Sequence, residues 1–144
     1  MANKGNVIVT GDKALDKTMA TMEAKIQKKV ARHAMRVATR GVILPQALRR
    51  VPVGKASKGS RNPGALKKSL TVKAFKRSRS RTGVAVVAGD GFFQGETYYS
   101  GMVEFGTKNM QANPFLRAAG YESKPQVQAL IVADIRKALA ELGK

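Results

Sequence analysis

The sequence predicts an α+β fold: a long N-terminal helix, a small antiparallel β-sheet, then a short helix and an amphipathic C-terminal helix packed on the sheet. Apolar residues recur at spacings of three and four in residues 15–37 and again in residues 127–142, which indicates helices at both ends. Short runs rich in β-branched residues, separated by turn-forming residues, lie between them. Helices and strands segregated in this order are typical of α+β proteins.

The domain organisation expected from the sequence is simple. A chain of 144 residues fits one domain and can bury enough surface to fold without a disulfide or a metal. We expect residues 1–11 to form a flexible arm, because they are polar and contain glycine. Residues 12–144 should form a single domain, in which residues 51–64 are a basic loop containing proline, glycine and serine.

The first helix is expected from Asp12, a suitable N-cap, to Arg40. Gly41 and Pro45 should weaken or kink it, with a further helical stretch beyond. The only histidine, His33, lies on the apolar stripe, so we expect it to be a structural or a partly buried residue rather than a base or a ligand. The stripe consists of Leu15, Met19, Met22, Ile26, Val30, His33 and Val37.

Three strands are expected in the middle of the chain. They cover Leu70–Phe75, Gly83–Ala88 and Tyr98–Phe105, joined by a basic turn and by a glycine-rich turn at residues 89–95. In the third strand, Val103 and Phe105 alternate with Glu104, which predicts two inward side chains and one outward carboxylate.

Two helices are expected after the strands. Asn113-Pro114 is a favourable helix start, and that helix should end near Gly120. Ser123 and Gln126 have the spacing of a capping box at the start of the last helix. Its apolar stripe comprises Val127, Leu130, Ile131, Ile135, Ala138, Leu139 and Leu142.

The positive charge is concentrated in the middle of the chain. The formal net charge is +18, and no acidic residue lies between Glu23 and Asp90, a segment with 18 lysines and arginines. A polyanion or an acidic protein surface would relieve the repulsion among these charges, although a solvated face is equally compatible with the pattern. The single aromatic residue in the basic run, Phe75, argues against a stacking platform for nucleic acid.

Enzymatic chemistry finds no support in the sequence. There is no cysteine, one histidine and no phosphate-binding glycine motif, and the nine acidic residues show no catalytic or metal-ligating spacing. We therefore expect no catalytic, cofactor-binding or metal site. No apolar run approaches the ~20 residues of a membrane helix, and the start of the chain lacks a signal-peptide core, so we expect synthesis and action in a cytoplasm.

Two segments of the second half form a recognisable pair. Residues 98–107 read Y-Y-S-G-M-V-E-F-G-T, and residues 112–119 read A-N-P-F-L-R-A-A. The pair resembles the signature of the tail-completion, or head–tail joining, proteins of long-tailed bacteriophages: a tyrosine, V-E-F-G-T, and P-F-L-R opening a helix. Val51-Pro52 and residues 64–69 occupy the places of the family's V-P turn and T-G-x-L-R-x-S segment. In element order the resemblance spans roughly residues 15–142.

The chain departs from the family pattern at several positions. Pro63 stands where threonine or serine usually precedes the glycine, and Ala118 replaces a common proline. The loop at residues 55–62 is longer and more basic than usual. These departures concern loop contacts more than the fold.

The resemblance implies a structural virion protein of the phage neck that joins the DNA-filled head to the tail. Such a protein would form an oligomeric ring, for which we expect a hexamer, between the head-side connector or adaptor and the tail terminator or tail tube. The basic segment would contact either DNA in the central channel or acidic surfaces of these neighbours. Two alternatives belong to other classes: a basic nucleic-acid-binding or packaging protein, which the composition favours, and a small nuclease, which lacks the ligands it would need.

Two sets of residues carry these expectations. The first is the motif set, whose apolar members should lie in the core. The second is expected at the interface with other subunits or partners, with Glu104 pairing to a basic residue of a neighbour. The motif set is Tyr98, Val103, Phe105, Gly106, Thr107, Pro114, Phe115 and Leu116; the interface set is Glu104, Arg49, Arg50, Lys55, Lys58, Arg61, Arg77, Arg79 and Arg81.

Overall fold

The computed structural model describes residues 13, 17, 20, 24–54, 63–76, 81–91, 93 and 95–142. The arm at residues 1–11 and most of the basic loop lie outside the described residues. The elements in chain order are α2 (Ala24–Ala38), the π-helical turn η1 (Thr39–Ile43), α3 (Leu44–Arg50), α4 (Ala65–Ser69), β1 (Leu70–Ala74), β2 (Val84–Ala88), the 3-10 turn η2 (Gly95–Thr97), α5 (Ser100–Phe105) and α6 (Leu116–Leu142).

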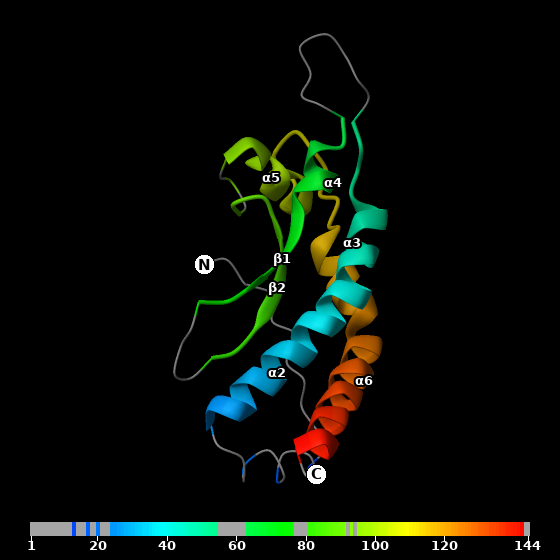
Figure 1. The fold of residues 1–144 in the computed structure, drawn as a ribbon. Helices are drawn as coiled ribbons and strands as arrows, with labels where there is room; N and C mark the ends of the chain where they lie inside the picture. The colour runs from blue at the N-terminus through cyan, green and yellow to red at the C-terminus, as the bar shows by residue number, and fades with distance from the viewer. Residues whose placement is uncertain are drawn as a thin grey trace.

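The fold is α+β, as the sequence predicts. The described strands β1 and β2 form an antiparallel ribbon in which Leu70 pairs with Ala88 and Ala74 pairs with Val84. Figure 1 shows three layers: the ribbon, then the continuous helix made by α2, η1 and α3, then α6. The body of α6 therefore packs along α2, η1 and α3 rather than directly on the sheet.

The first helix is interrupted by a π turn where the sequence predicts a weakness. At η1, the N–H of Leu44 donates to the carbonyl of Thr39, five residues back instead of four. Pro45 follows in the first turn of α3 and has no N–H to donate to the preceding turn. The wider turn lets the chain pass Pro45 and continue as a helix to Arg50.

The C-terminal half contains one helix where the sequence predicts two. α6 runs without a break through Gly120 and Pro125. The carbonyl of Tyr121 loses its partner because Pro125 has no N–H, but both residues are exposed, so solvent can satisfy that carbonyl. The expected capping box is wrong: Ser123 is buried inside the helix, and its hydroxyl has no hydrogen-bond partner.

Two hydrophobic clusters hold the layers together. The sheet cluster gathers side chains from α3, α4, both strands and the start of α6 around Phe115. The helix-pair cluster lies between α2 and α6. The buried members of the sheet cluster are Ala47, Val51, Leu66, Leu70, Ala88, Phe115 and Ala119; those of the helix-pair cluster are Ala34, Ala38, Val127, Ile131 and Ile135.

The buried face of α2 differs from the predicted apolar stripe. Ala34 and Ala38 face α6, whereas Val37 is 44% exposed and Ile26 is also exposed. His33 is exposed, so it is not partly buried, but it bonds Asp134 of α6 at the surface. Val30, another residue of the predicted stripe, is partly buried and packs against the helix-pair cluster, so the stripe is partly met. The stripe residues before Ile26 lie outside the described residues.

Candidate functional site: the Glu104 junction and the surfaces around it

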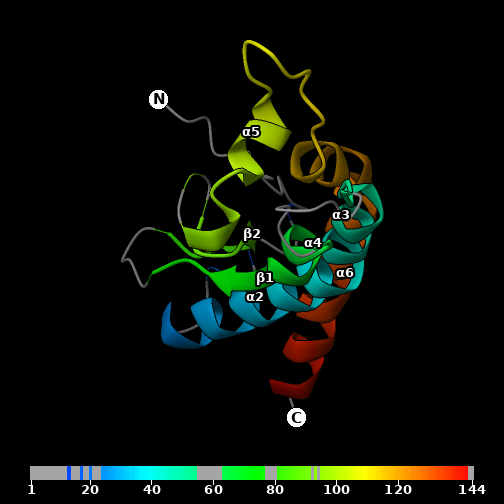
Figure 2. The same ribbon diagram turned by 90° about the horizontal axis from the view of Figure 1, so that it is seen from above.

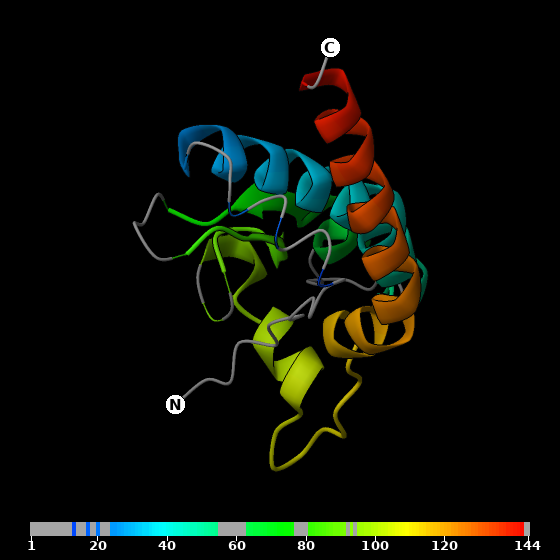
Figure 3. The ribbon, with the colours of Figure 1, turned by 90° about the horizontal axis from the view of Figure 1, so that it is seen from below.

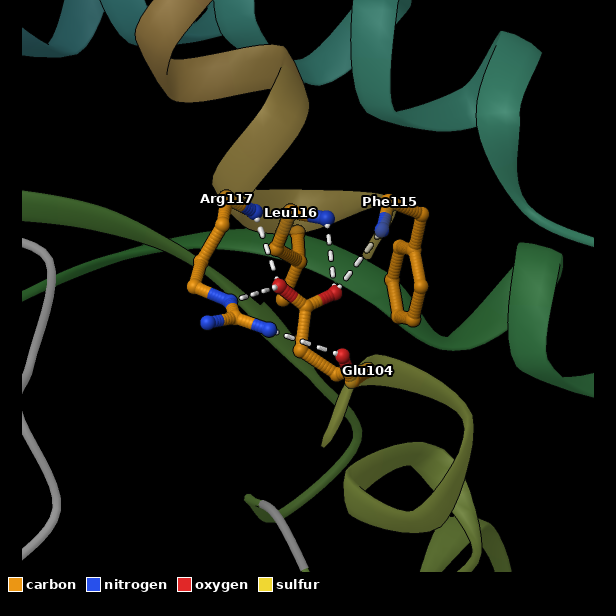
Figure 4. Close-up of polar contacts among 4 residues, drawn as sticks. All are labelled: Glu104, Phe115, Leu116 and Arg117. Carbon is orange, nitrogen blue, oxygen red and sulfur yellow. Dashed lines mark hydrogen bonds and ion pairs between the residues drawn. The ribbon is translucent and has the colours of Figure 1, made fainter. Parts of the chain in front are cut away.

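The Glu104 junction connects α5 to the start of α6. The Glu104 side chain is fully buried, and its carboxylate accepts three backbone hydrogen bonds (Figure 4). One oxygen, Oε2, accepts from the N–H groups of Phe115 at 2.8 Å and Leu116 at 3.0 Å. The other, Oε1, accepts from the N–H of Arg117 at 2.9 Å. Glu104 thus satisfies three of the donors that an unpaired helix start leaves free.

The junction is also favourable electrostatically. The start of an α-helix carries a partial positive charge, and an anion placed there is stabilised. The Nε of Arg117 donates to Oε1 at 3.2 Å, and its Nη2 donates to the Glu104 carbonyl at 3.1 Å. The buried carboxylate is therefore paired and hydrogen-bonded, which is the condition under which a charge can be buried in a protein.

Arg117 links the buried carboxylate to the surface. Its guanidinium lies 4.9 Å from the ring centroid of Phe105, a cation–π distance. Phe105 is 45% exposed, and the Arg117 side chain is exposed to a similar degree. One face of the Arg117 guanidinium thus lies on the exposed Phe105 ring, while its N–H groups donate hydrogen bonds to Glu104.

The predicted orientation of the V-E-F segment is wrong. Residues 100–105 form helix α5 instead of a strand, and Glu104 points inward while Phe105 points outward. Short apolar runs do not distinguish strand from helix by periodicity, and here burial of the carboxylate at the start of α6 determines the outcome. Because the Glu104 carboxylate is enclosed by its own chain, it is not positioned to pair with a neighbouring subunit.

The segment between the two halves of the motif is a tight loop. Gly106 ends α5 with a positive φ of 76°, and a Cβ there would meet the backbone nitrogen of Ala112 at 2.8 Å, so a glycine is required. The hydroxyl of Thr107 accepts from the N–H of Asn109, the local backbone bond expected of it. The N–H of Asn113 donates to the Val103 carbonyl, so Asn113 braces the loop instead of capping the helix.

The remaining motif residues divide between the core and the surface. Phe115 is fully buried at the centre of the sheet cluster, as predicted. Val103 and Leu116 are partly buried against the same cluster, and Pro114 is partly buried. Tyr98 is exposed, with its ring edge-on to Tyr99. The core assignment is therefore confirmed for Phe115, partly met by Val103 and Leu116, and wrong for Tyr98 and Phe105.

The basic residues of the expected interface are only partly described. Arg49 and Arg81 are exposed. Arg50 is bonded within the chain, where its guanidinium pairs with Glu122 of α6. A second surface pair joins the same helices further down, between His33 Nδ1 and Asp134 Oδ2 at 3.0 Å. Five predicted interface residues lie outside the described residues: Lys55, Lys58, Arg61, Arg77 and Arg79.

The described part of the chain offers no arrangement for metal chemistry. Within it, no group of three or more histidine, aspartate or glutamate side chains is placed to hold a metal ion. None of the described helices is both long and apolar enough to cross a membrane.

Comparison of the chain with protein-family models, with curated proteins and with solved structures gives no match. The candidate site is therefore described from the contacts within this chain alone.

Sequence reasoning missed two members of the site. Arg117 was read only as part of P-F-L-R, although an arginine 13 residues after a glutamate at a helix start is compatible with a closed ion pair. Phe93 was read as part of a glycine-rich turn, yet its ring lies directly over Gly101 of α5. The small residue at position 101 is the signal that could have indicated a close neighbour.

Proposed function

We propose that this chain is a structural protein of the neck of a long-tailed bacteriophage. It joins the DNA-filled head, at the connector, to the tail as part of an oligomeric ring. The observation that carries the proposal is the pairing of V-E-F-G-T at residues 103–107 with P-F-L-R at residues 114–117, which resembles the tail-completion proteins.

The geometry of the motif supports treating the two segments as one unit. Glu104 of the first segment binds the N–H groups of Phe115, Leu116 and Arg117 in the second. If only one of the two segments resembled the family by chance, there would be no reason for Glu104 of one segment to bind the backbone of the other. A shared structural role explains why both segments occur together at this spacing.

The charge distribution supports a docking role over a catalytic one. Described residues 24–54, 63–76 and 81–89 contain no acidic residue, so this part of the molecule is uniformly basic. A polyanionic surface, either DNA in a channel or an acidic neighbouring protein, is the complementary partner. Such electrostatic complementarity mainly accelerates and orients association.

The proposal is tested by electron microscopy of lysates from a phage that lacks this gene. Without the protein we expect separate DNA-filled heads and free tails, and joined particles after purified protein is added back. Normal joined particles in the untreated lysate would contradict the proposal. A matched control is the Gly106→Ala variant, which should not fold its junction and should leave heads and tails separate.

A nucleic-acid-binding or packaging protein is the second candidate, and the +18 charge favours it. It predicts DNA binding by the monomer whose affinity falls steeply with salt, at about −0.9 log units per phosphate contact for each log unit of salt. Fluorescence anisotropy with a labelled duplex measures this slope. Tight DNA binding together with no joining activity would favour this candidate over the neck assignment.

A further inference from the structure

We infer that the exposed side of the first helix binds the sugar–phosphate backbone of double-stranded DNA without reading its sequence. The contact is carried by Lys29, Arg36 and Arg40, together named the α2 basic ridge. The inference deepens the proposed function, on which it rests for the source of the DNA, because it names the partner that this part of the basic segment meets. It stands on the placement, the exposure and the unneutralised charge of these side chains.

The α2 basic ridge lies on the side of the helix that faces away from α6. Its three side chains are all exposed. Ala38 follows Lys29 by nine residues, about two and a half turns, and is therefore on the opposite side of the helix. Ala38 is fully buried in the helix-pair cluster. Figures 2 and 3 agree with this placement, since both show α2 at the margin of the molecule with the β1–β2 ribbon on its inner side.

The charge of the ridge is not neutralised within the described residues. None of its three side chains takes part in an ion pair there. Arg32, one turn before Arg36, is half-buried, and its Nε is buried without a hydrogen-bond partner. A buried donor that lacks an acceptor is uncommon in proteins and calls for an explanation. Phosphate oxygens would supply the acceptors and the negative charge that this side of the helix lacks.

The acidic residues nearest to α2 come from α6 and do not cancel this charge. Asp134 is bonded to His33 Nδ1 at 3.0 Å, at the edge where the two helices meet. Glu141 lies in the last turn of α6. The same half of the helix carries Arg136 and Lys137, so its net charge is zero. An approaching polyanion therefore meets the field of the ridge without a net repulsion from α6.

The dimensions of the ridge suit a nucleic-acid strand. Lys29 and Arg40 are separated by about 16 Å along the axis, at about 1.5 Å per residue. Each strand of B-DNA carries a phosphate about every 3.4 Å of its axis. A row of cations on one side of a helix can therefore follow one strand, and arginine can bind a phosphate through two parallel hydrogen bonds.

The composition of the helix favours a phosphate backbone over an acidic protein as the partner. α2 contains no phenylalanine, tyrosine or tryptophan, and the exposed Ile26 and Val37 lie toward the α6 side of the ridge. Protein interfaces depend on aromatic or arginine anchors in desolvated pockets. Contacts to phosphates need only accessible cations, and they carry no sequence information.

The experiment compares two triple variants that lose the same charge. Lys29→Gln, Arg36→Gln and Arg40→Gln together remove the ridge. The control removes three exposed lysines of other elements: Lys67→Gln in α4, Lys108→Gln in the loop after α5 and Lys124→Gln in α6. Both variants lower the formal net charge of +18 by three. Glutamine is a good helix former, so both should keep the fold, which circular dichroism checks.

Fluorescence anisotropy with a labelled duplex measures binding by the purified full-length chain from about 50 to 200 mM salt. The logarithm of the affinity should fall linearly with the logarithm of the salt concentration. The slope of the ridge variant should be shallower by about 2.7, at about 0.9 for each of three phosphate contacts, and the control should keep the wild-type slope. Equal slopes for the two variants, or no binding by the wild type at the lowest salt, overturn the inference. Tighter binding of the wild type to polyglutamate than to the duplex also overturns it, because the partner would then be an acidic protein surface.

Lysine footprinting of the wild type gives a second readout that needs no variant. Lys29 and Lys108 are both exposed, and Figures 2 and 3 place the loop after α5 on the far side of the ribbon from α2. On treatment with acetic anhydride and mass spectrometry, the duplex should protect Lys29 from acetylation and leave Lys108 reactive. Equal protection of the two lysines overturns the inference.

The failure of this inference and the failure of the proposed function give different results. Duplex binding through the ridge by a protein that does not join heads to tails in the phage lysate would remove the neck assignment alone. Joining by a wild-type protein that does not bind the duplex would remove this inference alone.

Discussion

The sheet cluster and the helix-pair cluster are built in different ways. In the sheet cluster, five elements converge on Phe115, and the buried Glu104 carboxylate lies beside it. In the helix-pair cluster, two helices meet along a seam in which Ala34 and Ala38 of α2 receive the larger Val127, Ile131 and Ile135 of α6. The first draws its members from five elements, whereas the second joins two helices and leaves Val37 of α2 44% exposed beside it.

The difference separates the part of the molecule that maintains the fold from the part available for contact. An enclosed cluster with a buried charge tolerates little change, because each lost atom leaves a cavity or an unpaired group. A two-helix seam tolerates surface changes on its open side. The comparison can be tested with substitutions of decreasing expected effect.

The largest effect is expected for Phe115→Ala. Removing a fully buried phenylalanine from the meeting point of five elements should lower the free energy of unfolding by about 3–5 kcal/mol. Urea denaturation followed by circular dichroism measures the change. A loss below that of Ile131→Val, which removes one methylene from the helix seam, would contradict the ranking of the two clusters.

Glu104→Gln should cost about 2–3 kcal/mol in unfolding free energy while keeping the side-chain volume. The amide has one acceptor oxygen, and its NH2 group would face backbone donors and Arg117, leaving buried groups unpaired. Thermal and urea unfolding provide the measurement. An unchanged stability would contradict the role of Glu104 as the group that satisfies the backbone donors at the start of α6.

Ala38→Leu should destabilise the protein by about 1–3 kcal/mol. The larger side chain would separate α2 from α6, because Ala38 is fully buried in the seam. The matched change Val37→Leu, one residue away on the open side, should be close to neutral. Equal effects of the two substitutions in urea denaturation would show that the buried face of α2 has been misassigned.

The smallest effect is expected for Asp134→Asn. The bond to His33 lies at the surface, where the histidine side chain is 69% exposed, and solvent screens such pairs. We expect a change in stability below about 1 kcal/mol. A double-mutant cycle with His33→Ala isolates the pair, and a coupling comparable to the Glu104 effect would refute the surface assignment.

Local patterns in the sequence predicted the two strands of the ribbon and the helical character of residues 127–142, but not helix α5 or the continuity of α6. Both strands of the ribbon appear within a residue or two of their expected bounds, and the buried positions Val127, Ile131 and Ile135 follow the expected helical spacing. These features depend on alternation and on the 3.6-residue period, which are visible in a single sequence. The interruption of the first helix near Pro45 was also predictable, because proline has no N–H to donate to the preceding turn.

The long-range features were not predictable in the same way. The identity of residues 100–105 as a helix depends on where Glu104 finds its donors, 11 to 13 residues away. The buried face of α2 depends on where α6 packs: Ala34 and Ala38 are buried there and Val30 is partly buried, whereas Ile26 and Val37 are exposed. The periodicity of each segment alone encodes neither outcome: it predicts a strand at residues 98–105, where α5 forms, and it does not predict that His33 is exposed.

The Glu104 junction also has a consequence for how the chain folds. Glu104 and its three backbone donors are separated by a short loop, so bringing them together costs little chain entropy compared with forming the contacts between α2 and α6. We therefore expect residues 100–119 to form native contacts early, with φ-values near 1 for the junction and low values for Ile131 and Ile135. The first turn of α6 would then be the point from which the helix grows toward its C-terminal end.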